Sequence, residues 1–148
     1  MTHAPAPPPP QVPTALPGFA FAPYHDPYER RAGPFFFKSD AKDGVVCGFV
    51  AAPEHFNGEG SLHGGMLMSF ADYAAFMIAQ PELKDMTAVT LTCYCDFLRA
   101  GRTPGAAVLA KGEITRASRN FVFVRGDILC EDKRLASFTM TLKKLPLR

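Results

Sequence analysis

The 148-residue sequence lacks several features that would each point to a particular class of protein. Its 16 basic and 14 acidic residues leave a formal charge of only +2, which excludes the strongly basic surface of a nucleic-acid-binding protein. No apolar run reaches the roughly 18 residues that a membrane-spanning helix needs. The start of the chain, MTHAPAPPPPQVP, has neither the basic nor the apolar region of a signal peptide. We therefore expect a cytoplasmic protein that binds neither nucleic acid nor membrane.

The chain also lacks the cysteine and histidine spacings of a disulfide-rich or metal-binding protein. With 47% hydrophobic residues it has enough apolar sequence for a core without disulfides. We expect reduced, buried thiols at Cys47, Cys93, Cys95 and Cys130. His55 and His63 are eight residues apart, which is no recognised metal spacing, and the nearby GEGSLHGG lacks the Gly-Lys-Ser/Thr end of a nucleotide-binding loop. We expect no metal and no cofactor.

Proline is frequent at the start of the chain and sparse afterwards, because ten of the 14 prolines lie between Pro5 and Pro34. Residues 1–17 are expected to be a disordered Pro-rich tail. A proline-rich ligand for a partner domain is the alternative for this tail. Residues 18–43 are aromatic but interrupted, and we expect an N-terminal extension that packs on the domain as short helical turns. Its three consecutive phenylalanines, residues 35–37, are expected to lie in a hydrophobic seam.

From residue 44 to residue 148 the pattern becomes regular, as in a single folded domain. Residues 44–52 are β-branched and aromatic and lie between Gly and Pro, which predicts a strand. Residues 65–79 are free of proline and apolar on nearly all sides, which predicts a buried helix ended by Pro81. Four further strands, joined by short hairpin-type connectors, are predicted at residues 88–98, 105–116, 120–130 and 134–143.

These elements predict an α+β domain in which a curved antiparallel sheet wraps round one long central helix. The helix is the only predicted element long enough to cover one face of such a sheet. The other face keeps apolar positions, and an edge strand stays exposed. We therefore expect the chain to form a dimer, which would cover both.

The predicted helix carries one carboxylate, Asp72, inside its apolar sequence. An ionised, unpaired carboxylate is strongly unfavourable in such a place, and no Lys or Arg lies within one helical turn of it. Two interpretations stay open. Asp72 either bonds nearby hydroxyl or backbone groups as a structural acid, or it faces a cleft where a raised pKa suits a general base or a nucleophile.

Gly64 and Gly65 open the predicted helix, so their N–H groups belong to the unsatisfied donors at its positive end. Such donors bind a phosphate, or the oxyanion that forms when a carbonyl is attacked. Asp72 follows Gly64 by eight residues, about 12 Å along the helix, which is too far for the two groups to hold one carbonyl. In a dimer with antiparallel helices, Asp72 would approach Gly64 of the partner subunit. This geometry favours a site shared across the interface.

The segment EHFNGEGSLHGGMLMSFADYAA resembles the motif of hotdog-fold acyl-CoA thioesterases of the phenylacetic-acid-pathway type, also described as 4-hydroxybenzoyl-CoA-thioesterase-like or acyl-CoA thioesterase 13-like. In that family an Asn lies six residues before a His-Gly-Gly and an acid lies nine residues after the His. Asn57, His63 and Asp72 have this spacing. The later AVTLTCYCDFLRA resembles the strand that follows the family's helix, with Thr90 at its hydroxyl position. The resemblance covers roughly residues 44–145.

The resemblance implies hydrolysis of acyl-CoA thioesters by a hotdog-fold homodimer, commonly paired into a homotetramer, without a metal. Asp72 would be the general base or the nucleophile, and the Gly64 N–H would polarise the thioester carbonyl. Asn57 would orient the water or the thioester, and His63 would shape the loop or bond near the carbonyl. Thr90 would position water beside Asp72 from the partner subunit.

Further positions are implied as substrate-binding residues. Gly65 and Ser69 lie at the start of the helix, and Arg116, Ser118 and Arg119 lie at a predicted hairpin turn. This turn is either simply solvated, or it contacts the phosphates of coenzyme A as similar turns do in the family. A non-catalytic acyl-CoA-binding module on the same fold stays open as an alternative function. A hydratase on a related fold would need a catalytic His paired differently with the acid.

Overall fold

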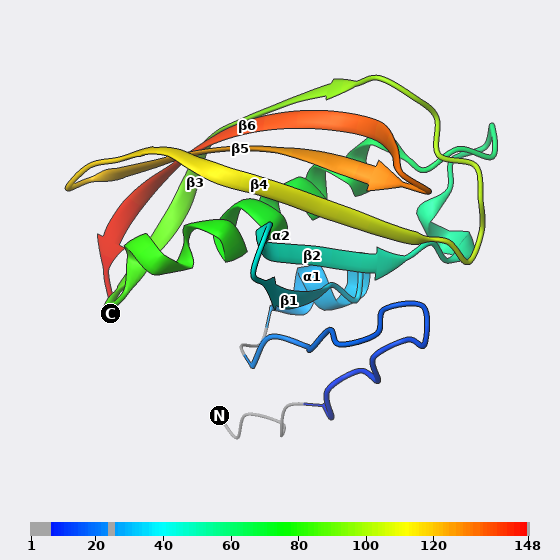
Figure 1. Ribbon diagram of the computed structural model, residues 1–148, viewed down its shortest axis with the longest axis horizontal. Coiled ribbons are helices and arrows are strands. Elements are labelled where there is room, and N and C mark those ends of the chain that lie inside the picture. Colours follow the sequence, from blue (N-terminus) through cyan, green and yellow to red (C-terminus); the bar gives the residue numbers. More distant parts are fainter. Residues whose placement is uncertain (1–6, 24–25, 148) are drawn as a thin grey trace, which may run out of the picture.

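The computed structural model describes residues 7–23 and 26–147, whose arrangement is shown in Figure 1. The elements in this part of the chain are α1 (Pro27–Ala32), β1 (Phe36–Asp40), β2 (Gly44–Val50), a 3₁₀ turn (Pro53–His55), α2 (Gly64–Leu83), β3 (Met86–Phe97), β4 (Ala107–Ala117), β5 (Phe121–Cys130) and β6 (Lys133–Pro146). The strands form one antiparallel sheet in the order β1-β2-β4-β5-β6-β3. The sheet curves round α2, so the predicted α+β hotdog architecture is confirmed.

Helix α2 begins at the end of the glycine-rich loop because His63 caps it. Nδ1 of His63 accepts a hydrogen bond from the N–H of Gly65 at 2.9 Å. The helix ends later than predicted, since Pro81 lies inside its last turn and Lys84, with a φ of 41°, terminates it. A proline inside a helix costs about 3 kcal/mol. Leu83, beyond the proline, is only 4% exposed, and its burial offsets about 2 kcal/mol of that cost.

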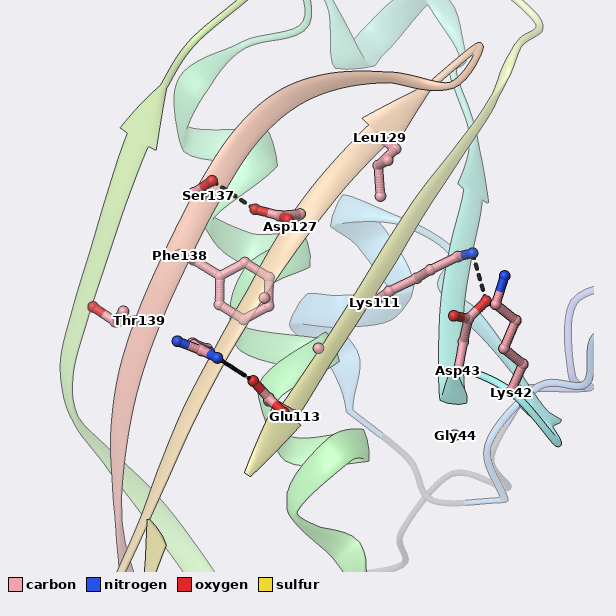
Figure 2. Close-up of a pocket in the computed structure, with 13 residues that line it drawn as sticks. Lys42, Asp43, Gly44, Lys111, Glu113, Asp127, Leu129, Ser137, Phe138 and Thr139 are labelled. Carbon is pink, nitrogen blue, oxygen red and sulfur yellow. Dashed lines mark hydrogen bonds and ion pairs between the residues drawn. The ribbon is translucent and has the colours of Figure 1, made fainter. Parts of the chain in front are cut away.

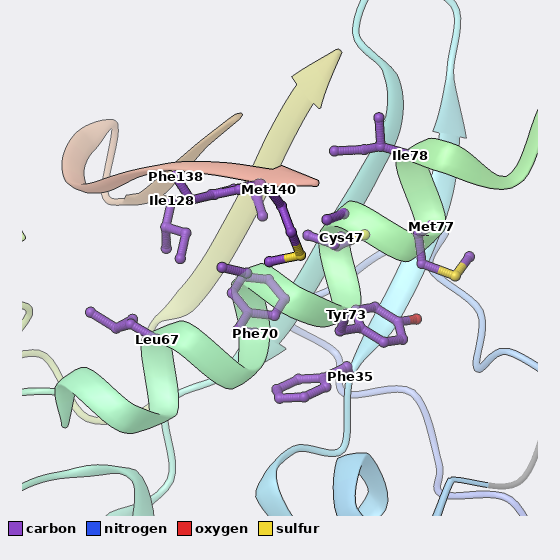
Figure 3. Close-up of a cluster of buried hydrophobic side chains, with 14 of the residues drawn as sticks. Phe35, Cys47, Leu67, Phe70, Tyr73, Met77, Ile78, Ile128, Phe138 and Met140 are labelled. Atoms are coloured by element: carbon purple, nitrogen blue, oxygen red, sulfur yellow. The ribbon is translucent and has the colours of Figure 1, made fainter. Parts of the chain in front are cut away.

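The main apolar core lies between α2 and the inner face of the sheet, as Figure 3 shows. The ring of Phe70 in α2 lies 4.8 Å from that of Phe49 in β2 and 5.3 Å from that of Phe35, measured between centroids. All three rings are buried. Aromatic pairs of this kind add about 0.5–1.5 kcal/mol to the stabilisation from burial itself. Phe35 precedes residue 44, so the N-terminal extension contributes to the same core as α2.

The segment after Phe35 forms β1, a strand that the sequence pattern did not predict. It pairs with β2, and the pairing starts with Phe36 opposite Gly48. Because side chains alternate along a strand, Phe36 points to the outer face of the sheet while Phe37 packs against the main core. The three consecutive phenylalanines therefore serve both faces of the sheet, and the expected single seam is wrong.

A second, smaller apolar cluster lies on the outer face of the sheet. Its buried members are Leu16, Phe19, Phe36 and Val46. Gly48 of β2 makes room for the N-terminal segment here, because a Cβ at this position would come within 2.9 Å of both the Leu16 and the Phe19 side chains. The chain thus begins to pack on the sheet at Leu16, inside the range expected to be a disordered tail; residues 1–6 of that range lie outside the described residues.

The predicted hairpin between the strands at residues 88–98 and 105–116 is wrong. β3 pairs with β6 along its length. The connector after β3 leads to β4, which β5 and β6 separate from β3 in the sheet. Backbone bonds hold this connector in place, including one of 2.9 Å from the Leu62 N–H to the Gly101 carbonyl. β3 is therefore an edge strand. Apolar side chains stay exposed on it and just after it, at Val89, Leu91, Tyr94, Phe97 and Leu98.

Candidate active site

Asp72 lies half-buried in the middle of α2, on the side of the helix that meets β3. Its Oδ1 accepts a hydrogen bond from Oγ1 of Thr90 in β3 at 2.6 Å. Burial raises the pKa of the Asp72 carboxyl above its ordinary value, the Thr90 bond works against this rise, and the negative charge of Asp26 adds to it. No salt bridge reaches Asp72 from the residues that the structure describes. Its pKa is thus shifted in the direction that suits a general base.

A pocket of about 330 Å³ opens beside Asp72 between the start of α1, the middle of α2 and β3. The residues that line it are Asp26, Tyr28, Glu29, Met68, Ser69, Asp72 and Cys93. Oγ of Ser69 donates its hydrogen to the Gly65 carbonyl at 2.9 Å, so the Tyr28 hydroxyl is the donor in the 2.7 Å bond between Tyr28 and Ser69. This bond joins α1 to α2 at the rim of the pocket. Of the expected substrate-binding residues, Ser69 therefore lies beside Asp72.

The loop before α2 is ordered by its own polar side chains. Oδ1 of Asn57 accepts hydrogen bonds from the N–H groups of Glu59 at 2.9 Å and Ser61 at 3.0 Å. His63 occupies the N–H of Gly65 as the helix cap. The Gly64 N–H has no hydrogen-bond partner within the part of the chain that the structure describes. Of the two glycines, Gly64 is therefore the one whose donor is open to an incoming carbonyl oxygen.

Gly64 and Asp72 lie about two turns apart on α2, as expected from their spacing. Gly64 does not line the pocket at Asp72. It lies under the exposed ring of Phe97, because a Cβ at position 64 would come 3.3 Å from the tip of that ring. Thr90 was expected to reach Asp72 from the partner subunit, and this is wrong: it bonds Asp72 of its own chain, since β3 passes directly beside α2. One chain thus holds the acid and its hydroxyl partner together, and the glycine donor elsewhere.

The remaining expected substrate-binding residues lie at the hairpin between β4 and β5, away from the pocket at Asp72. Arg116 and Ser118 line a separate hollow of about 460 Å³ together with Phe121 and other side chains. Oγ of Ser118 accepts a hydrogen bond from the Phe121 N–H at 3.1 Å and so closes the turn. Arg116 and Arg119 are exposed and form no salt bridge with any described residue.

Sequence reasoning missed Asp26, Tyr28, Glu29 and Cys93 as residues of the pocket. Asp26 accepts hydrogen bonds from the N–H groups of Tyr28 and Glu29, and Pro27 follows it, which is a readable start of a helix. That signal predicts a helix but not its contact with Ser69, 41 residues further along. Burial, and then the charge of Asp72, raise the pKa of the Cys93 thiol, which keeps it protonated and unsuited to nucleophilic attack.

A surface hollow of about 890 Å³ lies on the outer face of the sheet and contains none of the catalytic or substrate-binding residues named above (Figure 2). Most of its charged groups have a partner in an ion pair, and Lys42 is the exception among the described residues that line it. Nζ of Lys111 lies 2.6 Å from Oδ2 of Asp43, and Nε of Arg125 donates to Oε1 of Glu113 at 2.7 Å. Asp127 accepts a bond from the Ser137 hydroxyl at 2.6 Å. Paired groups of this kind stabilise a surface and leave no free acid or base for chemistry.

His55 serves the loop structure. It is buried, its Nδ1 accepts a hydrogen bond from the Ala52 N–H at 3.0 Å, and its Nε2 therefore donates to the Gly33 carbonyl at 3.1 Å. Among the described residues no three His, Cys, Asp or Glu side chains gather as a metal site. No α-helix in that part of the chain combines the length and the apolarity needed to cross a bilayer.

Comparison with known proteins identifies the family of the chain. The family described as the thioesterase superfamily matches residues 59–137, from the glycine-rich loop into β6. The chain belongs to this superfamily, as a member of the hotdog-fold acyl-CoA thioesterase family. The match includes both Gly64 and Asp72. No curated protein matched the sequence.

Solved structures of this family superpose on most of the chain. The phenylacetic acid degradation protein PaaI of Thermus thermophilus, solved as a mutant, is 30% identical, with 81% of this chain and 100% of that one covered at a TM-score of 0.68. PaaI from the E. coli phenylacetic acid degradation operon is 23% identical, with 81% and 85% covered at a TM-score of 0.69. A hypothetical thioesterase of Streptococcus pneumoniae, solved with coenzyme A, is 22% identical, with 80% and 92% covered at a TM-score of 0.69. The last two support the fold alone.

Proposed function

We propose that this protein hydrolyses acyl-CoA thioesters to a free acid and coenzyme A. The observation that carries the proposal is Asp72, a half-buried carboxylate with a raised pKa, which opens into a pocket and is bonded by a hydroxyl and by no cation among the described residues. A structural acid in such a helix would be expected to have a full set of donors. Membership of the thioesterase superfamily supports the same class of reaction, and a protein of the same fold has been solved with coenzyme A.

The proposed site is shared between two subunits that pair through β3. This edge strand exposes a row of unpaired backbone groups and the apolar side chains of Val89 and Leu91, and a second copy of β3 would cover both. Asp72 lies on the β3 side of α2, where the second subunit would arrive. In an antiparallel arrangement of the two α2 helices, the partner subunit's Gly64 would come near Asp72. A further pairing of such dimers into a homotetramer is part of the proposal.

In the proposed reaction the thioester carbonyl oxygen accepts a hydrogen bond from the N–H of the partner subunit's Gly64, at the positive end of α2. As general base, the Asp72 carboxylate takes a proton from water while the water oxygen bonds to the carbonyl carbon. The tetrahedral intermediate then expels the coenzyme A thiolate, which is protonated, and leaves the carboxylic acid. If Asp72 is instead the nucleophile, its oxygen forms the first bond and water cleaves the resulting anhydride.

Three loop and strand residues would support this chemistry. The Asn57 side-chain amide N–H₂, which no described residue accepts, would orient the water or the thioester, since its Oδ1 is already used by the loop. His63 would hold the loop as the helix cap. Thr90 would hold one oxygen of Asp72 so that the other faces the water. The exposed Arg116 and Arg119, with Ser118 between them, would contact the phosphates of coenzyme A.

The decisive experiment measures release of coenzyme A thiol from aryl-CoA and C4–C16 acyl-CoA substrates by wild type and Asp72→Asn. We expect wild type to turn over at least one class, and kcat of the variant to fall by a factor of about 10²–10⁴. Asp127→Asn removes one carboxylate from the outer face of the sheet and should keep wild-type kcat. If wild type binds acyl-CoA but hydrolyses none of the panel, the protein is instead a non-catalytic acyl-CoA-binding module.

Mixed subunits test whether the site is shared. Gly64→Pro removes the proposed oxyanion donor and suits the backbone, since proline is favoured at the first position of a helix and the extended backbone of His63 suits a following proline. Its Cβ would lie 3.3 Å from the exposed ring of Phe97. Equal mixing of inactive Asp72→Asn and inactive Gly64→Pro, after dissociation and reassociation, should restore about a quarter of wild-type activity, because half of the dimers then contain one intact site. A mixture that stays inactive while hybrid dimers are detected would contradict the shared site.

A single turnover in H₂¹⁸O would label Asp72 only if it is the nucleophile.

A further inference from the structure

Helix α1, which lies outside residues 59–137 matched by the family, forms one wall of the pocket at Asp72. It reaches the pocket with Asp26 at its N-cap and with Tyr28 and Glu29 in its first turn. Opposite these residues lie Ser69 of α2 and Cys93 of β3. Any acyl group that reaches Asp72 through this pocket therefore passes α1.

The charge of the pocket is of one sign. Asp26, Glu29 and Asp72 are carboxyl groups, and no Lys, Arg or His is among the described residues that line the pocket. The Asp26 carboxylate is held in place, since its Oδ1 accepts the N–H groups of Tyr28 and Glu29, each at 2.9 Å. Charges of like sign repel strongly in a partly desolvated pocket, where the effective dielectric constant is well below that of water.

A hydrogen bond between α1 and α2 also holds α1 in position. The Tyr28 hydroxyl donates to Oγ of Ser69, which itself donates to the Gly65 carbonyl of the first turn of α2. This chain of bonds fixes Asp26 relative to Asp72, because both are carried by the helices that it joins. Tyr28 thus acts as a positioning residue.

We propose that α1 determines the acyl specificity of the site. Asp26 repels acyl groups that carry a free carboxylate. The enzyme therefore selects neutral acyl chains over the monothioesters of dicarboxylic acids. The inference rests on the proposed thioester hydrolysis and names its substrate class by charge. Rejection by an unpaired like charge is a general route to specificity, because the disfavoured ligand cannot neutralise the repulsion. The negative charge of Asp26 also acts on Asp72, the proposed base. The groups that face Asp72 are Asp26, Tyr28 and Glu29 from α1 and Thr90 and Cys93 from β3.

The test compares kcat/KM for glutaryl-CoA and 5-methylhexanoyl-CoA, which have nearly the same shape and differ in the distal carboxylate. Wild type should prefer the neutral thioester by about tenfold or more, and Asp26→Asn should reduce that ratio about tenfold. Asparagine keeps the helix cap, so a loss of fold is not expected. The acid limb of the Asp26→Asn pH profile should also move to lower pH, because removing a negative charge favours ionised Asp72. A merely structural role would change neither readout.

Two further variants complete the test. Asp40→Asn is the matched control, because Asp40 also accepts two backbone N–H bonds in a turn, from Lys42 and Asp43, but does not line the pocket. It should leave the ratio and the pH profile unchanged. Tyr28→Phe removes the bond to Ser69 and should lower the ratio in the same direction as Asp26→Asn, by a smaller factor.

The outcomes separate this inference from the proposed hydrolysis. If wild type hydrolyses both thioesters equally well, or Asp26→Asn changes neither the ratio nor the pH profile, the inference is overturned and the hydrolysis stands. If wild type hydrolyses nothing, the hydrolysis fails, and discrimination is measured by calorimetry with the corresponding non-hydrolysable CoA thioethers. Equal binding of the charged and neutral thioethers would then overturn the inference as well.

Discussion

The two faces of the sheet use their charged residues in opposite ways. On the outer face Lys111, Glu113 and Arg125 are paired with neighbours, and the hollow that they line has a volume of about 890 Å³. On the inner face Asp72 is one of three carboxyl groups that line a pocket less than half as large, and it has a hydroxyl as its partner. Among the described residues, the smaller hollow is the one that holds an acid of raised pKa.

This difference teaches that chemistry follows the state of the charged group and not the size of the cavity. Partial burial without a neighbouring cation raises the pKa of the Asp72 carboxyl. The apolar clusters on the two faces also differ. The inner core packs α2 on the sheet, whereas the outer cluster attaches only the N-terminal segment. Substitutions on the two faces should therefore have different consequences.

The largest expected effect is on stability and compares the two apolar clusters. Phe70→Ala in the inner core should cost about 3–5 kcal/mol of unfolding free energy, because the ring is fully buried among other aromatic rings. Leu16→Ala on the outer face should cost about 2 kcal/mol, since the small cluster collapses more easily onto the cavity. Urea unfolding of both variants checks the order. An equal cost would show that the N-terminal segment is as integral to the fold as α2.

The next effect concerns the bond between Thr90 and Asp72. Thr90→Val removes a donor that lowers the pKa of Asp72, so this pKa should rise further and the acid limb of kcat/KM should move to higher pH, since a general base acts when deprotonated. At pH values below the acid limb, kcat/KM should fall about tenfold, which corresponds to the free energy of one hydrogen bond to a charged group. The pH profile of the variant measures both changes. An unchanged limb would mean that Thr90 does not bond Asp72 in the protein in solution.

The smallest effect is expected from the outer face. Arg125→Ala breaks the pair with Glu113, whose side chains are 64% and 59% exposed, and should cost less than about 1 kcal/mol. Thioester hydrolysis should not change, because this pair lies on the opposite side of the sheet from Asp72. Thermal unfolding and kcat, measured together, test this. A loss of activity with unchanged stability would place a function on the outer face and weaken the contrast between the two faces.

Much of this protein is determined by local sequence. Strand-like runs between turn residues predicted β2 to β6 to within a few residues, and the apolar run predicted α2, because these patterns depend on residues close together in the sequence. The motif from Asn57 to Asp72 also lies within one loop and one helix. Its resemblance to the thioesterase motif indicates the family to which the chain belongs. The isolated acid in an apolar helix left open whether Asp72 is a structural or a catalytic group.

Only the tertiary structure decided which distant segments meet. It placed β3 beside β6 and at the edge of the sheet, brought Thr90 to Asp72 of the same chain, and carried α1 to the rim of the pocket through a bond that spans 41 residues. It also let α2 continue past Pro81, because Leu83 is buried beyond it. Such contacts depend on the total burial and pairing that the whole chain achieves, and spacing along the sequence carries no record of that balance.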